Sequence, residues 1–318
     1  MSHSRTDIRS ENILSVIEAL TREPYMTRDA LAQYCHLSLT TVGKIINRLH
    51  DYGVLSQKQI QSVKNGRTLS AFAISDSIAM ATFRIGEYHM TMELLDLRFR
   101  PLRRVHQAVL PDRDPGESLL SFLLLCRREL EASRKHILLC GLLSENTRMD
   151  SDMISQTMHT YLKLPVTIGD SAVHAIARAA SHEGIAADDR CVAVISNDAS
   201  CSGFMIYHSI LRQGAVSPIR QERYDRSCFA EEMLHAIQIL TAFIIPDTLL
   251  ICSLQDTEDL QANLETALKA SAMRDRPTVA IRNTDRMLSL GMAIHMRHTW
   301  LEEMHRETQR LRPTASPH

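Results

Sequence analysis

The chain lacks paired cysteines. Its seven cysteines occur singly and none forms a Cys-x-x-Cys pair, which argues against a zinc ribbon and gives no support for a disulfide framework. Most of them lie in apolar runs, where cysteine usually behaves as a small core residue. A reducing compartment is the simpler setting, and we expect a cytoplasmic protein. The positions are Cys35, Cys126, Cys140, Cys191, Cys201, Cys228 and Cys252.

Segments typical of secreted or membrane proteins are also missing. The N-terminus is polar and shows no signal-peptide pattern. The most apolar stretch, Ile237 to Leu254, is interrupted by Pro246-Asp247-Thr248, so its pattern predicts a helix, a turn and a strand rather than a membrane span. We therefore expect no membrane partner.

Short sequence signatures of enzymes are absent as well. The 15 histidines are scattered, with no His-x-x-x-His pattern and no Gly-x-Ser-x-Gly elbow. His295 and His298 stand three positions apart near the end of the chain, a spacing that would suit a metal. We interpret them instead as part of one helical face, because residues three apart are neighbours on any helix. No metal site is expected.

What the chain does contain is a pattern typical of a winged helix-turn-helix, between residues 24 and 75. Thr27 is expected to open a short helix with Leu31 and Tyr34 facing inward, and Leu37-Ser38 to form the turn. A second helix is predicted from Thr40-Thr41 onward. Its apolar residues recur with the 3.6-residue period of a helix that buries one face. They are Val42, Ile45, Ile46 and Leu49.

The opposite face of this second helix is polar, with the size and chemistry needed to enter the major groove of DNA. From it we expect Thr40, Thr41 and Lys44 to contact base edges, and Ser38 and Arg48 to hold phosphates. Asn47 lies on the same face. Gly43 interrupts the helix, where glycine costs about 1 kcal/mol relative to alanine. It either permits a close backbone approach to DNA or is simply tolerated.

A β-hairpin is predicted after this helix. Asn65-Gly66 is a strong two-residue turn signal, because a type I′ turn needs positive φ at both central positions. Lys64 and Arg67 flank the turn, so the tip is basic and is expected to hold the DNA backbone or the minor groove. Residues 40 to 68 carry five basic side chains and one acidic one, in a chain whose formal net charge is −1. Such a positive patch is typical of phosphate contact. The alternative is a small helical domain for protein contacts.

The remaining residues predict a larger α/β domain in which one element order occurs twice. Each half is expected to contain three short strands, then a helix, a strand, a helix, a strand and a last helix. The first half includes a predicted helix at 151–162, and the second half includes predicted helices at 229–243 and 258–271 and a strand at 248–253. This order is typical of the actin and sugar-kinase (ribonuclease H-like) fold, with two lobes around a cleft. The predicted division is 1–76 for the winged helix-turn-helix and 77–318 for the body. Lobe one is expected to comprise 77–168 plus a C-terminal helix at 285–312, and lobe two 169–284.

Several local segments then resemble the ROK family, named for repressor, open reading frame and kinase. They are Leu39-Thr40-Thr41-Val42, Asn65-Gly66-Arg67, Leu164-Pro165-Val166 before Gly169-Asp170, the stretch Gly203 to Gly214, and Leu290-Gly291-Met292-Ala293. The resemblance covers nearly the whole chain. It implies a winged helix joined to a sugar-kinase-like body, as in the repressors of that family.

The resemblance also implies two glycine-rich turns for ATP phosphates, and neither is present. The first, normally Asp-x-Gly-Gly-Thr, stands here as Arg84-Ile85-Gly86-Glu87-Tyr88. The second, normally Gly-Thr-Gly-x-Gly-Gly-Gly, stands as Asp198-Ala199-Ser200-Cys201-Ser202-Gly203-Phe204. The family's Cys-x-Cys-Gly zinc segment is reduced to Cys228, and one thiolate cannot build a tetrahedral site. We expect no cofactor, no catalytic residues and no enzymatic activity.

One residue aligns with the family's catalytic aspartate. Asp170 stands where the general base of an Asn-Asp-x-Asn motif would be, but Gly169 and Ala172 replace the two asparagines. Because aspartate is a favoured N-cap, we interpret Asp170 first as the cap of the helix from Ser171 to His182. A contact to an effector is the second interpretation, and catalysis as the general base is the third.

The sequence thus predicts a DNA-binding transcriptional regulator, a repressor, with a kinase-like body that has lost its catalytic chemistry. The expected partners are double-stranded DNA, a second copy of the chain (a homodimer or a dimer of dimers) and a carbohydrate-derived effector. Two alternatives stay open: a carbohydrate kinase of the ROK family that carries a winged helix, and a DNA-binding scaffold without small-molecule input.

Overall fold

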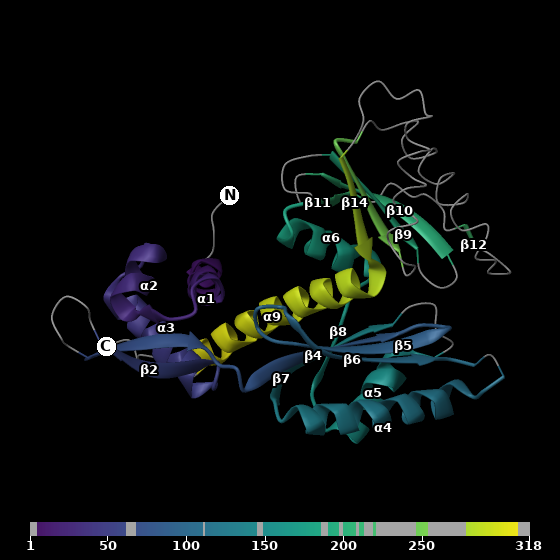
Figure 1. Ribbon diagram of the computed structural model, residues 1–318, viewed down its shortest axis with the longest axis horizontal. Helices are drawn as coiled ribbons and strands as arrows, with labels where there is room; N and C mark the ends of the chain where they lie inside the picture. Colours follow the sequence, from purple (N-terminus) through teal and green to yellow (C-terminus); the bar gives the residue numbers. More distant parts are fainter. Residues whose placement is uncertain are drawn as a thin grey trace, which may run out of the picture.

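The computed structural model describes residues 5–61, 68–110, 112–144, 149–185, 190–196, 200–207, 210–212, 219–220, 246–253 and 278–310. These residues form three sheets with helices around them. Figure 1 shows a small N-terminal unit, a lobe built on β4 to β8, and a second lobe built on β9 to β14. A single long helix, α9 (Thr284–Arg310), runs between the two lobes and ends beside the N-terminal unit.

The N-terminal unit is a winged helix-turn-helix, as predicted. It consists of α1 (Arg5–Arg22), β1 (Met26–Thr27), α2 (Arg28–Tyr34), α3 (Leu39–Asp51), β2 (Leu55–Gln61) and β3 (Thr68–Ile74). The three strands form an antiparallel sheet in the order β1-β3-β2, with Leu55 opposite Ile74 and Gln61 opposite Thr68. Gly53, with φ of +70°, ends the chain reversal between α3 and β2 where a side chain would be strained.

One predicted feature of this unit is wrong. Tyr34 does not face inward: it is 45 % exposed, whereas Leu31 is fully buried. The reason is that α2 ends at Tyr34 after only seven residues, and Leu31 and Ala32 already fill its interface. The Tyr34 hydroxyl instead lies on the surface, where it accepts a hydrogen bond of 3.1 Å from Arg22.

Lobe one is a five-stranded sheet in the order β6-β5-β4-β7-β8. Its strands are β4 (Ile78–Ile85), β5 (His89–Leu95), β6 (Pro101–Ala108), β7 (His136–Ser144) and β8 (Val166–Ile168). β4, β7 and β8 are parallel, and β4, β5 and β6 form an antiparallel meander. Helices α4 (Pro115–Ser133) and α5 (Ser151–Leu162) cover one face, and α9 covers the other (Figure 1).

Lobe two repeats the arrangement in the order β11-β10-β9-β13-β14. Its elements are α6 (Ala172–His182), β9 (Arg190–Ser196), β10 (Ser200–Tyr207), β11 (Ile210–Arg212), β12 (Ile219–Arg220), β13 (Thr248–Ser253) and β14 (Thr278–Asn283). β9, β13 and β14 are parallel, as β4, β7 and β8 are. The predicted duplication of element order is therefore confirmed for the strands. The predicted helices at 229–243 and 258–271 lie outside the described residues.

Helix α9 joins the three parts through one core. It packs against α1, α6, β4 and β7. Gly291 allows α6 to cross at close range, because a Cβ on this residue would lie only 1.8 Å from the carbonyl oxygen of Ala175. The apolar cluster that begins in α1 and α3 continues through α9 into lobe two. None of the described helices is long and apolar enough to cross a membrane.

Candidate nucleic-acid interface

Helix α3 begins with a side-chain cap. Ser38 is its N-cap, so the helix starts one residue before the predicted position. The Ser38 hydroxyl accepts a hydrogen bond of 3.1 Å from the backbone N–H of Thr41. The two hydroxyls of Ser38 and Thr41 also share a hydrogen bond of 2.8 Å. Both side chains, which we expect to meet DNA, are thus held in fixed positions at the N-terminal end of α3.

The outer face of α3 is polar apart from Leu39, the first residue of the helix, which is 49 % exposed. Thr40, Lys44 and Asn47 are exposed, and Arg48 is half-buried, while the apolar stripe on the other side is buried. This arrangement confirms the predicted amphipathic helix. The 13 residues of α3 make a rod about 20 Å long at 1.5 Å per residue, which fits into a major groove.

The predicted hairpin is present as β2 and β3. On its surface, the side-chain amides of Gln57 and Gln59 both donate to the Ser70 hydroxyl, at 2.9 and 3.3 Å. Lys58 lies over the Tyr25 ring, 5.2 Å from its centroid. The tip of the hairpin, with Lys64, Asn65, Gly66 and Arg67, lies outside the described residues, so the expected turn and its DNA contacts stay predictions.

A groove of about 430 Å³ separates α3 from the hairpin. Sequence reasoning missed it, because its walls come from helices and strands that meet only in the fold. Besides Asn47 it brings together the start of α2, the end of α3 and the middle of both strands. The lining residues are Thr27, Arg28, Asp29, Ile46, Asn47, His50, Asp51, Gln57, Leu69, Ser70 and Phe72.

Arg28 is the basic residue of this groove. It is exposed at the first position of α2, and its guanidinium would lie 3.5 Å from a Cβ on Gly43. Gly43 therefore packs beneath Arg28, and the contact distance is an ordinary one that alanine would also satisfy. Asp29 and Asp51 line the same groove. Their charges repel phosphate, so the groove is most favourable to an anion beside Arg28.

A buried ion cluster stands at the position of the family's first phosphate turn. Arg84 is 5 % exposed; its guanidinium donates to Asp285 of α9 at 2.6 Å and contacts the His89 ring. Arg104 donates to the same carboxylate. Burial alone would raise the pKa of Asp285, but the hydrogen bond from His89 and the Arg84 and Arg104 charges hold this pKa well below its usual range.

The chain also departs from the family pattern at the position of the second phosphate turn. Residues 197–199 lie outside the described part of the chain. From Ser200 onward the segment is not a turn but strand β10, with Cys201 opposite Ser196 and Phe204 opposite Ala193 on β9.

Asp170 is not the N-cap we expected, and this interpretation is corrected. The cap of α6 is Ser171, whose hydroxyl accepts from the backbone N–H of His174 at 3.3 Å. Asp170 instead accepts hydrogen bonds from the Ser171 N–H at 3.0 Å and from Arg178 at 2.5 Å. Burial raises the pKa of Asp170, but the hydrogen bonds from Arg178 and the Ser171 N–H, together with the Arg178 charge, outweigh it and the net direction is downward. The carboxylate is therefore ionised and already partnered.

His295 and His298 lie on α9 as a helical face, in agreement with the interpretation from spacing. His298 is 3.7 Å from the Glu302 carboxylate one turn later, and burial lowers the pKa of His295. Among the described residues, no group of three or more histidine, cysteine, aspartate or glutamate side chains is arranged to hold a metal ion. Cys228 lies outside them.

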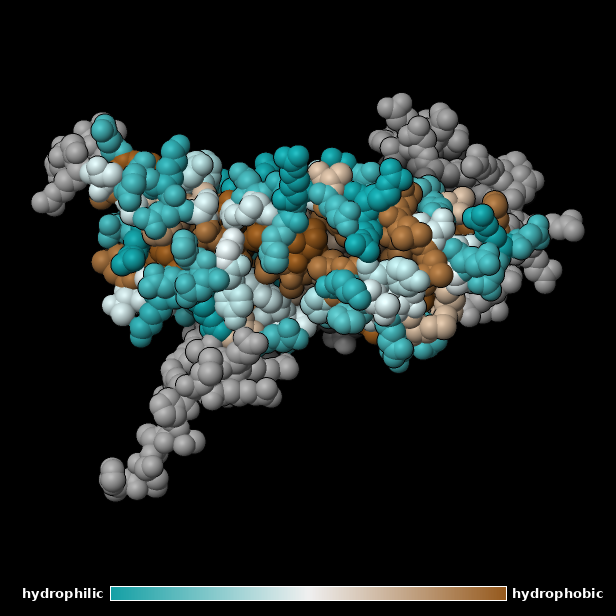
Figure 2. Space-filling model, turned by 90° about the horizontal axis from the view of Figure 1, so that it is seen from below, coloured by the Kyte–Doolittle hydropathy of each residue, from teal (hydrophilic) through white to brown (hydrophobic). Residues whose placement is uncertain are grey.

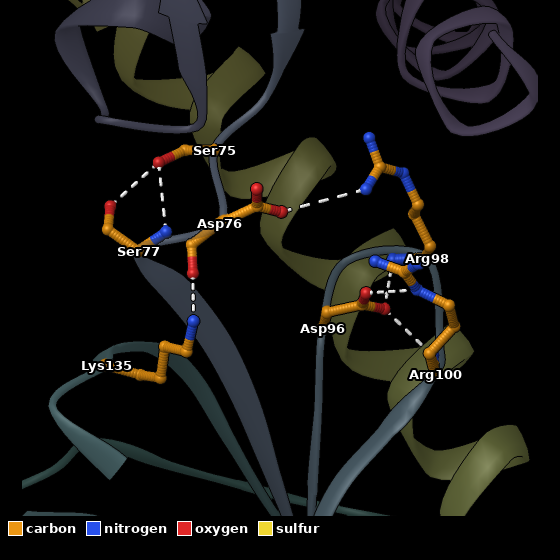
Figure 3. A network of polar contacts seen from close by, with 7 residues as sticks. All are labelled: Ser75, Asp76, Ser77, Asp96, Arg98, Arg100 and Lys135. Carbon is orange, nitrogen blue, oxygen red and sulfur yellow. Dashed lines mark hydrogen bonds and ion pairs between the residues drawn. The ribbon is translucent and has the colours of Figure 1, made fainter. Parts of the chain in front are cut away.

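The segment between the winged helix and lobe one is held by polar contacts (Figure 3). Lys135 donates to the backbone carbonyl of Asp76, and Arg98 lies 3.8 Å from the Asp76 carboxylate. Ser75 and Ser77 share a hydrogen bond of 2.7 Å between their hydroxyls. These contacts come from two sides of the connecting segment, so they limit its freedom to bend.

The contact with Arg98 belongs to a tight turn between β5 and β6. The Asp96 carboxylate accepts from the backbone N–H groups of Arg98 and Arg100 at 2.9 and 2.8 Å (Figure 3). This holds Phe99 at φ of +61° and buries its ring. The ring then touches His182 of α6 edge-on and Arg297 of α9, at 5.1 and 4.5 Å. Lobe one, lobe two and α9 therefore meet at Phe99.

The winged helix also contacts α9 directly. Tyr52, at the end of α3, packs edge-on against Trp300 of α9 with ring centroids 5.9 Å apart. Together with the shared apolar core, this contact and the pinned connecting segment seat the winged helix on the end of α9. A change at the lobe interface thus has a continuous packed route to α3.

Comparisons with known proteins agree with this architecture. Residues 9–56 match a family described as "Winged helix-turn-helix DNA-binding". No curated protein matches the chain in sequence. A crystal structure of a ROK family transcriptional regulator, described as a homolog of the E. coli MLC protein, is 12 % identical with a TM-score of 0.63. The likeness covers 94 % of this chain and 98 % of that one.

Two kinases give weaker structural likenesses. A ROK family glucokinase from Streptomyces griseus, solved with glucose and AMPPNP, is 11 % identical with a TM-score of 0.47, over 69 % of this chain and 99 % of that one. A putative N-acetylmannosamine kinase from Listeria monocytogenes is 13 % identical with a TM-score of 0.47, over 71 % and 100 %. The likeness to the ROK family transcriptional regulator shows the fold of this chain, a winged helix-turn-helix joined to a two-lobed α/β body, as its sequence predicted.

Proposed function

We propose that the protein is a DNA-binding transcriptional regulator of the ROK family, acting as a repressor. The observation that carries this proposal is the exposed polar face of α3, where Thr40, Lys44 and Asn47 project from a helix whose other side is buried. The match of residues 9–56 to a DNA-binding winged helix family supports it. The partner is double-stranded DNA, with α3 in the major groove.

The individual contacts are part of the proposal, and the position of each residue on α3 supports them. Thr40, Thr41 and Lys44 lie in its first turns and read base edges. Ser38 and Arg48 approach phosphates on either side, and the wing residues Lys64 and Arg67, with Asn65-Gly66 at the turn, hold the adjacent backbone. To this set the groove adds Arg28, because it is the exposed cation beside α3 at the start of α2. A helix N-terminus is itself favourable to a phosphate.

The body serves regulation and assembly rather than catalysis in this proposal. Arg84, at the position of the family's first phosphate turn, forms an ion pair with Asp285. At the position of the second turn the sequence is poor in glycine and contains the carboxylate of Asp198. A kinase would need both turns for ATP. Calorimetric titration with ATP and Mg²⁺ distinguishes the two interpretations of the body: heat of binding and phosphate transfer to a sugar would establish the kinase.

A carbohydrate-derived effector and a homodimer complete the proposal. Two copies would place two α3 helices on neighbouring half-sites, and a ligand in the body would change their spacing through α9 and the pinned segment at Asp76. Asp170 is the side chain we assign to the effector, although its partner Arg178 must then release it or share it. A scaffold without effector would show no thermal stabilisation by any sugar or sugar phosphate.

The test of DNA binding is selection of genomic DNA fragments by the purified full-length protein, repeated with Lys44→Ala and Arg67→Ala. A sharp two-fold symmetric footprint that both changes weaken is the expected result. The absence of any enriched fragment at low salt would overturn the proposal, because phosphate contacts are strongest there.

A further inference from the structure

The N-terminal end of α3 presents a leucine to the surface. Leu39 is the first residue of the helix and is 49 % exposed, between the cap Ser38 and the exposed Thr40. Figure 2 shows the N-terminal unit, at the left, as a mainly hydrophilic surface with hydrophobic side chains between the polar ones. A single exposed leucine is ordinary on most surfaces. This one, however, stands at the end of the helix that we propose to enter DNA.

Leu39 is held outside the core of the winged helix. The buried stripe of α3 begins one turn later with Val42, which is fully buried. On the other side, Leu37 is half-buried against the same core, and its backbone N–H donates to the carbonyl of Ala32 at 2.9 Å. The chain is thus anchored before and after Leu39, and the leucine itself is left at the surface.

The direction of the Leu39 side chain follows from its place in the helix. Side chains of a helix tilt toward its N-terminus, so the first residue reaches toward the space beyond the helix end. In a helix-turn-helix, the N-terminal residues of the second helix contact base edges in the major groove. The first turn of α3 contains no acidic residue, although a carboxylate there would stabilise the helix. This end of α3 can therefore approach DNA without charge repulsion.

A leucine side chain can recognise one feature of the base edges. It has no hydrogen-bond donor or acceptor, and the apolar group that a base pair presents in the major groove is the C5-methyl group of thymine. Guanine, adenine and cytosine present hydrogen-bonding atoms there. Thr40 and Lys44, on the outer face of the same helix, supply the hydrogen bonds that Leu39 cannot make.

We propose that Leu39 is a specificity-determining residue that selects thymine, by contact with its C5-methyl group, at one position of the half-site that α3 reads. The inference rests on the proposed DNA binding and deepens it, because it names a base that the operator contains. Threonine methyl groups also contact thymine, so Thr40 and Thr41 are the alternative source of such a preference. A change of the base combined with a change of the protein separates them.

The experiment uses the full-length chain and a duplex with the fragment selected from genomic DNA. Each thymine is replaced in turn by deoxyuridine, which removes the methyl group and keeps the pairing with adenine. Fluorescence anisotropy gives the affinities of wild type, Leu39→Ala and Leu39→Gln, two changes to good helix formers. Leu102→Ala is the matched control, because Leu102 is a 40 % exposed leucine on β6 of lobe one.

Uracil at the contacted position is expected to weaken wild type about fourfold, the usual effect of removing one methyl-sized group from an apolar contact. Leu39→Ala and Leu39→Gln are expected to bind the unmodified duplex more weakly and to be insensitive to uracil at that position. The two changes are then not additive, which is the sign of a direct contact. Leu102→Ala is expected to match wild type on every duplex.

Two results would overturn this proposal while leaving DNA binding intact. The first is a wild-type affinity that uracil changes at no position of the operator. The second is a pair of Leu39 variants that keep the full wild-type response to uracil at every position, which would assign the methyl contact to another side chain such as Thr40. A wild-type chain that selects no DNA fragment would instead remove the proposed function, and this inference with it.

Discussion

Ser38 links the stability of α3 with its expected contact to DNA, because its hydroxyl caps the helix that carries the other contact residues. Ser38→Ala is predicted to destabilise the chain by about 1 kcal/mol, the usual cost of losing such a cap. Ser38→Asp keeps the cap but adds a negative charge beside the DNA backbone. We expect Ser38→Asp to be as stable to urea as wild type but to bind DNA more weakly. If its DNA affinity also equals that of wild type, Ser38 is not part of the interface.

A substitution at Gly43 is predicted to raise the stability of the chain rather than lower it. A Cβ at this position would meet the Arg28 guanidinium at 3.5 Å, an ordinary contact, and the backbone there is helical. Gly43→Ala is therefore expected to stabilise the folded chain by up to about 1 kcal/mol, the difference in helix propensity. Urea denaturation measures this. A destabilised variant would show that Arg28 cannot move and that the glycine is required for packing.

Residue-level prediction from sequence succeeds where the cause is local. Thr27 is identifiable as a helix start from its type and position, and its hydroxyl does accept from the Ala30 N–H at 3.2 Å. The prediction for Asp170 fails because Ser171, the next residue, is an equally good cap, and sequence alone does not decide between two adjacent caps. Arg28 escapes prediction because its importance comes from a groove formed by residues distant in sequence.

At the scale of elements, the ion cluster between β4 and α9 replaces what would be a phosphate turn. Asp285→Asn leaves the buried Arg84 without its carboxylate, and we expect a loss of about 3 kcal/mol of stability, as for other broken buried ion pairs. Asp170→Asn is the matched control, because the Asp170–Arg178 pair is 40 % and 26 % exposed and is expected to contribute at most about 1 kcal/mol. Equal losses of unfolding free energy for the two variants would contradict the conclusion that the buried Arg84–Asp285 pair contributes more to stability.

The Arg84–Asp285 pair also predicts how the stability of the fold depends on pH. The pKa of Asp285 is lowered in the folded chain, so the unfolded chain binds the proton more readily. Its contribution to stability is fully present above the ordinary aspartate pKa of about 4 and is lost as the pH falls below that value. Unfolding measured from pH 7 to pH 3 should thus show wild type converging on Asp285→Asn in acid. A constant difference would mean that Asp285 has an ordinary pKa.

Elements are predictable wherever a periodic pattern marks them. The strand at 248–253 and the helix at 151–162 are expected at the residues where the structure has them, because their apolar patterns are bounded by proline, glycine or polar residues. The Arg84–Asp285 contact could not be predicted in this way. It joins residues 201 positions apart, and no local pattern carries information about such a partner.

On the scale of the whole molecule, the winged helix is seated on α9 rather than tethered loosely. Trp300 is the single tryptophan of the chain, and it packs against Tyr52 of the winged helix. Tyr52→Ala should therefore move the intrinsic tryptophan emission to longer wavelength, because the indole loses a packing partner and gains water. Tyr34→Ala, which removes an exposed ring on α2, should leave the emission unchanged. Coincident spectra for wild type and Tyr52→Ala would show that the contact between Tyr52 and Trp300 is absent in solution.

The overall architecture could be predicted because order of elements, chain length and the winged-helix pattern all agreed. How the three parts are joined could not. The connection depends on Phe99, held in a left-handed conformation by Asp96, and on the close crossing at Gly291, features that appear only when distant segments pack. The division of the chain into residues 1–76 and 77–318 remains a prediction.

The central claim is that α3 binds DNA, and the most direct measurement is the affinity of the full-length chain for a selected fragment, by fluorescence anisotropy, with Lys44→Gln and Lys163→Gln. Both lysines are exposed, but Lys163 lies at the far end of α5 in lobe one. We predict that Lys44→Gln loses about 1–3 kcal/mol of binding free energy while Lys163→Gln matches wild type. Equal affinities for all three proteins would contradict the account.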